Sequence, residues 1–143
     1  MARYFTRELI EESVDFCNSD AEHIERSKML NGKMVLLALD TPDNKDVHVT
    51  YAFENGRCTG YDFEEEPAPS SFRDRGFTPM VDGVARVTSS YATFAKLDKG
   101  ELEPADAMNS NDYKVEGNMV MLLPLMQAVD SWTKKIREIK KEY

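Results

Sequence analysis

The segment Gly83–Gly117 constrains the fold more than any other part of the chain, because its strand, helix and turn signals follow one another without a gap. The β-branched run Val84–Thr88 predicts a buried strand. The next apolar side chains fall on one face of a predicted helix, Tyr91–Leu97, which the serines at 89–90 can cap. Gly100 stands where a helix needs a C-terminal residue in the left-handed conformation.

Three further signals complete this segment. Pro104 suits the first turn of a short helix, because the N–H that proline lacks would be unpaired there. The alternation in Tyr113–Glu116 predicts a half-buried strand. Gly117 then precedes the last helical pattern of the chain. The predicted order is therefore strand, helix, short helix, strand and helix.

This order and its residue pattern resemble the sterol carrier protein 2 (SCP2) family of lipid-carrier domains. The resemblance covers about a quarter of the chain and differs from the family at Asn111-Asp112, where family members often carry Gly-Lys. It implies an α+β fold, in which helices cover a five-stranded, mostly antiparallel sheet and an apolar tunnel lies between the two layers. The residues that carry the resemblance are Tyr91-Ala-Thr-Phe94, Lys99-Gly100, Leu102-Glu103-Pro104, Ala107 and Tyr113-Lys-Val-Glu-Gly117-Asn118.

Two helices are predicted before the first strand. Thr6 can cap a helix that reaches about residue 17. Ser19–Glu22 has the spacing of a capping box, which starts a second helix from Asp20 to about Leu30. Asn31-Gly32 ends that helix. We expect this helical front end to lie across the face of a sheet.

Three strands follow at short intervals. Lys33–Asp40 is apolar without alternation, which predicts a central strand buried on both faces. Val47–Phe53 alternates between apolar and polar residues, so it should have one apolar face. Asn55-Gly56 is the strongest hairpin signal in the chain and leads into a returning strand, Thr59–Phe63. These three strands are expected to be antiparallel neighbours.

The segment 64–82 interrupts this pattern with three consecutive acids, three prolines and a glycine. We interpret Glu64–Glu66 as a solvated turn, and expect an added or irregular strand around Phe77–Val81. A connection of this length is often functional. Two interpretations remain open. The segment is either a surface loop whose aromatic residues pack against the domain, or a flap over the mouth of a ligand site.

The longest helical pattern runs from Asn118 to about Lys141, and Pro124 should kink or restart it. Its C-terminal part, 132–143, is basic and has Trp132 on the apolar side. It therefore resembles a helix that lies on a membrane surface. The alternative is that basic residues favour a helix C-terminus and the apolar stripe packs on the N-terminal helices.

Composition and charge argue against several classes of function. The net charge of −8 argues against nucleic acid as a partner. The two cysteines form neither a metal-binding spacing nor a disulfide framework. We see no signal peptide and no apolar segment of the ~20 residues that span a bilayer. The expectation is one cytoplasmic domain, 1–143, with a family-like core at about 20–130, an N-terminal helix and a C-terminal helical extension.

No catalytic constellation is visible, so the sequence predicts no enzyme, no cofactor and no metal site. Both histidines, His23 and His48, are expected at the surface, and Cys17 is expected to be packed. A small α+β enzyme would need a buried acid or base, and the sequence singles out none among its Asp and Glu residues. We keep it as the third hypothesis.

The resemblance implies non-enzymatic binding and carriage of a lipid or other apolar ligand, such as a fatty acid, acyl-CoA or a sterol-like molecule. The alternative function is an accessory or dimerisation domain with a vestigial cavity, in which an exposed stripe on the last helix forms the homodimer seam. That stripe comprises Trp132, Ile136, Ile139 and Tyr143. The predicted ligand-binding residues are Phe94, Leu97, Met119, Leu122, Leu123 and Met126 on the helices, and Val49, Tyr51 and Phe53 on a strand.

Overall fold

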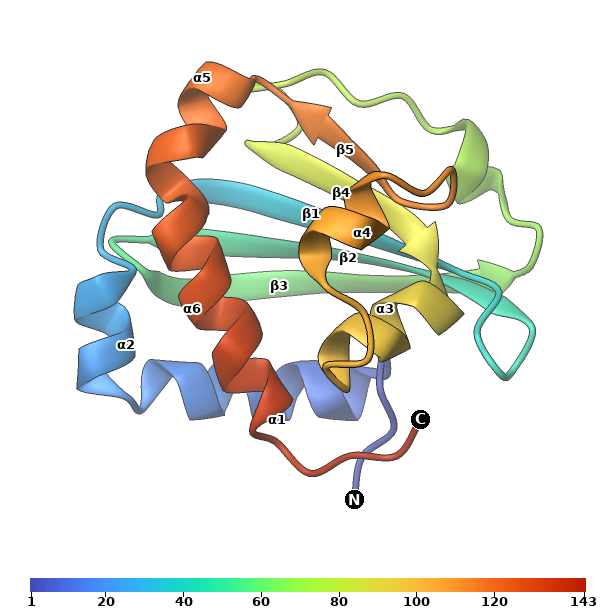
Figure 1. Ribbon diagram of the computed structural model, residues 1–143, viewed down its shortest axis with the longest axis horizontal. Helices are drawn as coiled ribbons and strands as arrows, with labels where there is room; N and C mark the ends of the chain where they lie inside the picture. Colours follow the sequence, from blue (N-terminus) through green and yellow to red (C-terminus); the bar gives the residue numbers. More distant parts are fainter.

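A five-stranded sheet organises the fold in the computed structural model, which describes residues 1–143 (Figure 1). The strand order is β3-β2-β1-β4-β5. The pair β1 and β4 is parallel and the other neighbours are antiparallel, which confirms the predicted mostly antiparallel sheet. The strands are β1 (Gly32–Leu39), β2 (Lys45–Glu54), β3 (Arg57–Pro67), β4 (Ala85–Ser90) and β5 (Lys114–Gly117).

The helices cover one face of this sheet. Figure 1 shows α6 lying across the sheet, α1 running along the β3 side and α3 beside the strand ends. None of the helices combines the length and the apolar character needed to cross a membrane. The α-helices are α1 (Arg7–Asn18), α2 (Ala21–Arg26), α3 (Tyr91–Asp98), α4 (Pro104–Met108), α5 (Met119–Leu122) and α6 (Met126–Arg137), with 3₁₀ turns η1 (Ser71–Asp74) and η2 (Leu123–Leu125).

The core lies between the helices and the inner face of the sheet. Successive residues of a strand point to opposite faces, so β2 directs Val49, Tyr51 and Phe53 inward. Phe5 and Trp132 meet them from the helical side of the same cluster. The central strand β1 is buried on both faces as predicted.

Local signals in the sequence are confirmed at several turns and caps. The Thr6 side chain accepts a hydrogen bond from the Leu9 N–H and caps α1. Asn55 and Gly56 have φ values of 51° and 84°, which a tight hairpin between β2 and β3 requires. Gly100 has a φ of 75° beyond the end of α3, where a left-handed residue is expected.

Three helix boundaries differ from the prediction. Asp20, rather than Ser19, caps α2, because its carboxylate accepts from the N–H groups of Glu22 and His23. This helix ends at Arg26 instead of about Leu30. The last helical pattern breaks at Pro124 as predicted, but α6 ends at Arg137 rather than about Lys141.

The segment 64–82 also corrects the prediction. Glu64–Glu66 is not a turn: these residues continue β3 to Pro67 in register with β2. Each of the three adjacent acids has a partner: Glu64 pairs with Arg75, Glu65 lies 3.3 Å from Lys45, and Glu66 accepts a hydrogen bond from the Ser71 hydroxyl. No strand forms around Phe77–Val81, where there is only an isolated bridge between residues 79 and 83. The rest of the segment covers the outer face of the sheet and buries Phe72.

Candidate functional site

An apolar cavity of about 160 Å³ lies between the inner face of the sheet and helices α3 and α6. Of its 15 lining residues, 13 are hydrophobic. The strands contribute Met34, Leu36, Tyr51, Phe53 and Val87, the helices contribute Phe94, Leu97, Val129, Trp132 and Ile136, and Tyr4, Leu30 and Tyr113 complete the apolar lining. The remaining two, Asp98 and Thr133, are polar.

Trp132 is the central aromatic residue of this cavity. Its ring stands edge-on to Phe53 at 5.0 Å and to Tyr51 at 5.3 Å between centroids. Edge-to-face aromatic pairs contribute about 0.5–1.5 kcal/mol beyond the area they bury. Trp132 therefore both anchors α6 on the sheet and limits the free volume beneath that helix.

Asp98 gives the lining of the cavity a buried charged group. It is a buried carboxylate that accepts hydrogen bonds from Lys141 Nζ and from the Tyr143 hydroxyl. Burial, followed by the bond to Asp98, raises the pKa of Tyr143, so its hydroxyl remains a donor. The ammonium of Lys141 balances the charge of Asp98, which allows this ion pair to stay beside apolar side chains.

The structure places the nine predicted ligand-binding residues in three environments. Four of them line the cavity: Tyr51, Phe53, Phe94 and Leu97. Two are buried outside the cavity lining: Val49 in the main core, and Leu122 against Val84 and Ala85. Three are exposed at 52%, 66% and 49%: Met119, Leu123 and Met126. The last three lie in the α5–η2–α6 region, around the helix break at Pro124.

The predicted exposed stripe on the last helix is wrong. Trp132 and Ile139 are buried, and Ile136 lines the apolar cavity. The spacing of these residues did indicate an apolar helix face, but that face packs on the sheet and the N-terminal helices. It is therefore not available as the dimer seam that the sequence suggested, nor does it present Trp132 to a membrane.

The predicted surface positions of both histidines are also wrong. His23 is 1% exposed, and its Nδ1 lies 2.7 Å from the Ser131 hydroxyl of α6. His48 is 7% exposed and lies 5.6 Å from the ring of Phe72, which covers it. Burial lowers the pKa of each ring, so both are neutral at pH 7. Each histidine is covered by a segment far away in the sequence, and no local pattern signals that contact.

The remaining reactive groups are inaccessible. Cys17 and Cys58 are free thiols and both are buried, as predicted for Cys17. Burial raises the pKa of Cys17 to about 12, so it remains a thiol at neutral pH. No group of three or more His, Cys, Asp or Glu residues could hold a metal ion.

These features define an α+β domain with an apolar cavity between its sheet and its helices. Neither a protein-family model nor a curated protein matches the sequence. Solved structures do match, and they show that the chain has the sterol carrier protein 2 fold. The matches confirm the resemblance and the predicted α+β fold with helices on a five-stranded sheet, but they do not show the predicted apolar tunnel.

Three solved structures illustrate the likeness. A crystal structure of sterol carrier protein 2 has a TM-score of 0.75 and 20% identity, over 96% of this chain and 100% of that one. A conserved hypothetical protein from Thermus thermophilus, described as a candidate sterol carrier protein, has a TM-score of 0.73 and 20% identity, over 99% and 92%. Sterol carrier protein 2 from Yarrowia lipolytica, in its apo form, has a TM-score of 0.54 and 16% identity, over 92% and 89%.

Proposed function

We propose that this chain is a cytoplasmic, non-enzymatic carrier that binds a lipid or other apolar ligand between its sheet and α6. The candidate ligands are fatty acids, acyl-CoA and sterol-like molecules. The observation that carries this proposal is the cavity lined almost entirely by hydrophobic residues. The shared fold with proteins named as sterol carriers supports it.

Binding of this kind needs positioning but no bond-breaking chemistry. Each buried CH₂ group contributes about 0.8 kcal/mol when it leaves water, so eight methylenes contribute roughly 6 kcal/mol before the costs of binding. The cavity of about 160 Å³ is large enough for only part of such a chain. An apolar cavity of about 150 Å³ accepts a benzene-sized molecule, whereas drug-sized ligands occupy about 300–1,000 Å³.

A longer ligand therefore requires the helical layer to move. The region around Pro124 is suited to such a movement, because the helix is already interrupted there. Its neighbours Met119, Leu123 and Met126 are exposed rather than packed. A small displacement of this region and the start of α6 would lengthen the cavity without breaking the sheet.

The Asp98 carboxylate in the cavity lining restricts the orientation of the ligand. A second carboxylate placed beside it would lose its hydration without gaining a cation of its own, because the Lys141 ammonium is already paired with Asp98. A fatty acid would therefore keep its carboxylate away from Asp98. A hydroxyl group, as in a sterol-like molecule, could instead donate a hydrogen bond to Asp98.

The single tryptophan provides the test, because Trp132 lines the cavity and the chain has no other. Delipidated protein is titrated with dodecanoic acid and with cholesterol while tryptophan emission is recorded. Val129→Phe fills part of the cavity, and Val120→Phe makes the same change at a residue 78% exposed. Losing room for two CH₂ groups should weaken binding by at least about tenfold in Val129→Phe only.

Two results would contradict the proposal. One is an unchanged emission with both ligands, together with native mass spectra of freshly purified protein that contain no bound lipid. The other is equal binding by Val129→Phe and wild type, which would place the ligand outside this cavity. Circular dichroism of both variants checks that a loss of binding is not a loss of folding.

A further inference from the structure

His23 is buried at the contact between α2 and α6, next to the apolar cavity. Its Nδ1 lies 2.7 Å from the Ser131 hydroxyl of α6 and 3.4 Å from the Ser27 hydroxyl. The centroid of its ring lies 6.1 Å from that of Trp132, which lines the apolar cavity. A change in the charge of His23 therefore acts on the helix that covers this cavity.

The second ring nitrogen, Nε2, is buried and has no hydrogen-bond partner. The Ser131 hydroxyl accepts from Arg26 Nε at 3.3 Å, so it can donate its own proton to Nδ1 of the neutral ring. A protonated ring is a donor at both nitrogens, and its Nε2–H would then be buried without an acceptor. An unsatisfied donor on a buried charged group is strongly unfavourable.

The charged groups around the ring do not compensate for a proton on it. Those that act on the ring are Asp20 and Arg26 from α2 and Lys135 from α6. Asp20 is the anion of this set, but its carboxylate is already bound by Lys135 Nζ at 2.9 Å and by two backbone N–H groups of α2. Helix α1 and the β2–β3 hairpin also pack near α2 and contribute no charged group that acts on the ring. Burial, together with the two cations, lowers the pKa of His23.

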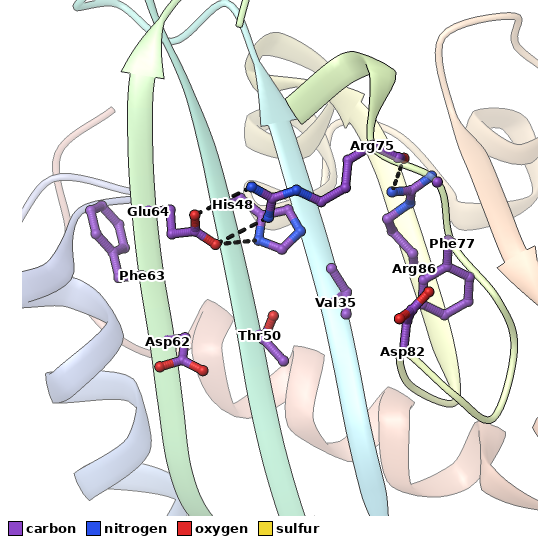
Figure 2. Close-up of a pocket in the computed structure, with 11 residues that line it drawn as sticks. Val35, His48, Thr50, Asp62, Phe63, Glu64, Arg75, Phe77, Asp82 and Arg86 are labelled. Atoms are coloured by element: carbon purple, nitrogen blue, oxygen red, sulfur yellow. Dashed lines mark hydrogen bonds and ion pairs between the residues drawn. The ribbon is translucent and has the colours of Figure 1, made fainter. Parts of the chain in front are cut away.

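His48 offers a contrast on the opposite face of the sheet. It lines an outer cavity of about 410 Å³, which lies between the sheet and the segment after β3 (Figure 2). Its Nδ1 lies 3.6 Å from Oε1 of Glu64, so a proton on this ring would face a carboxylate. Figure 2 shows the imidazole ring beside that carboxylate. The sheet separates His48 from α6, which makes it a matched control for His23.

We propose that protonation of His23 loosens α6 and opens the apolar cavity, so that His23 is a pH-sensitive switch. The proton is accommodated when α6 moves away from α2 and water reaches Nε2. Acid therefore favours the open arrangement, in which Trp132 no longer closes the cavity. The faster release of a ligand in acid rests on the proposed function, whereas the movement of α6 does not.

The size of the effect follows from the ordinary pKa of histidine, about 6.5. The ring regains this value in the open arrangement and stays neutral in the closed one. Lowering the pH from 7.5 to 5.5 then multiplies the ratio of open to closed protein by up to about ten. Amide exchange in α6 and the dissociation rate of a ligand both depend on this ratio.

Hydrogen exchange of the ligand-free, full-length chain tests the movement of α6. Amide protection factors are measured by NMR at pH 7.5 and 5.5, each relative to the intrinsic exchange rate at that pH. His23→Asn removes the titrating group and keeps a polar atom near the position of Nδ1, and His48→Asn makes the same change at the other buried histidine. Circular dichroism checks folding, and His23→Gln takes the place of His23→Asn if that variant does not fold.

In the wild-type chain, the protection of the α6 amides should fall by up to about tenfold between pH 7.5 and 5.5. His23→Asn should abolish this dependence on pH, whereas His48→Asn should keep it. The proposal is overturned if acid leaves the protection of α6 unchanged in wild type, if His23→Asn keeps the dependence, or if His48→Asn abolishes it.

The release of a ligand is measured with 1-dodecanol, which has no group that titrates in this range. Its dissociation rate, followed by the emission of Trp132, should rise by the same factor in wild type and in His48→Asn, but not in His23→Asn. A rate that stays constant while the protection of α6 falls would overturn the opening of the cavity. Failure of 1-dodecanol to bind at pH 7.5 would count against the lipid proposal, and the hydrogen exchange, which needs no ligand, would still decide on the switch.

Discussion

Replacing Asp46 by alanine should cause one of the largest losses of stability available in this chain. Its carboxylate is fully buried and joins the β1–β2 turn to the segment that covers the outer face of the sheet. It accepts from Asp40 N–H at 3.0 Å, Ser70 N–H at 3.0 Å and Ser70 Oγ at 2.7 Å. Arg73 donates two more hydrogen bonds, at 2.7 and 2.9 Å. These bonds hold the pKa of Asp46 far below its ordinary range despite its burial.

The size of this loss of stability follows from the polar groups that lose their partner when the carboxylate is removed. Removing one partner of a buried ion pair costs about 3–5 kcal/mol, but the Arg73 side chain is 32% exposed and can partly regain water. Losing the bonds to Ser70 adds about 1–3 kcal/mol, because its donors are buried without an acceptor. We therefore expect a loss of about 4 kcal/mol in the free energy of unfolding.

Urea denaturation followed by circular dichroism measures this loss. With an m value of about 2 kcal/mol per molar, the midpoint should fall by about 2 M. The control is Asp43→Ala, whose exposed ion pair with Arg3 should be worth no more than about 1 kcal/mol. A double-mutant cycle of Asp46→Ala and Arg73→Ala should give a coupling of at least about 1 kcal/mol. Equal midpoints for the Asp46 and Asp43 variants would refute the reasoning.

Two further predictions concern pH and backbone conformation. Burial lowers the pKa of His23 and of His48 below 6.5, so in acid the unfolded chain binds more protons than the folded chain. The contribution of the two neutral rings to the free energy of unfolding is therefore complete above about pH 6.5 and is lost as the pH falls below that value. Between pH 7.5 and 5.5, the double variant His23→Gln/His48→Gln should lose less stability than wild type. The difference between the two proteins should be at most about 1.4 kcal/mol per histidine per pH unit. Urea titrations that give both proteins the same dependence of stability on pH would contradict this prediction. Gly56→Ala should cost about 2–4 kcal/mol by thermal or urea unfolding, because φ is +84° and a Cβ would lie 2.6 Å from the Ser27 backbone. Gly60→Ala, where a Cβ meets nothing within 4 Å, should unfold close to wild type, and a similar loss in both would argue against the clash.

The amino-acid sequence was sufficient for those features that depend on a few adjacent residues. The hairpin at Asn55-Gly56, the N-cap at Thr6 and the left-handed Gly100 are confirmed, because each depends on the local backbone conformation. The alternation of Val47–Phe53 likewise identified the inner face of β2. These local signals, in their order along the chain, were enough to predict the SCP2 fold.

The candidate sites depended on contacts that no local pattern contains. The predicted cavity residues on the last helix were chosen by helical periodicity, but the break at Pro124 left Leu123 and Met126 exposed while Trp132 entered the cavity. The sequence pattern does not predict the outer cavity either, because three adjacent acids indicate a turn whereas Glu64–Glu66 belong to the last part of β3.

What the sequence alone determined was therefore the set of elements, their turns and most of their apolar faces. Tertiary structure decided which polar groups became buried: His23 meets Ser131 across 108 positions, and Asp46 meets Ser70 across 24. Burial changes the pKa and the hydrogen-bonding needs of such groups, and it arises only when distant segments pack together. The two cavities have the same origin, because each lies between the sheet and a segment distant in the chain.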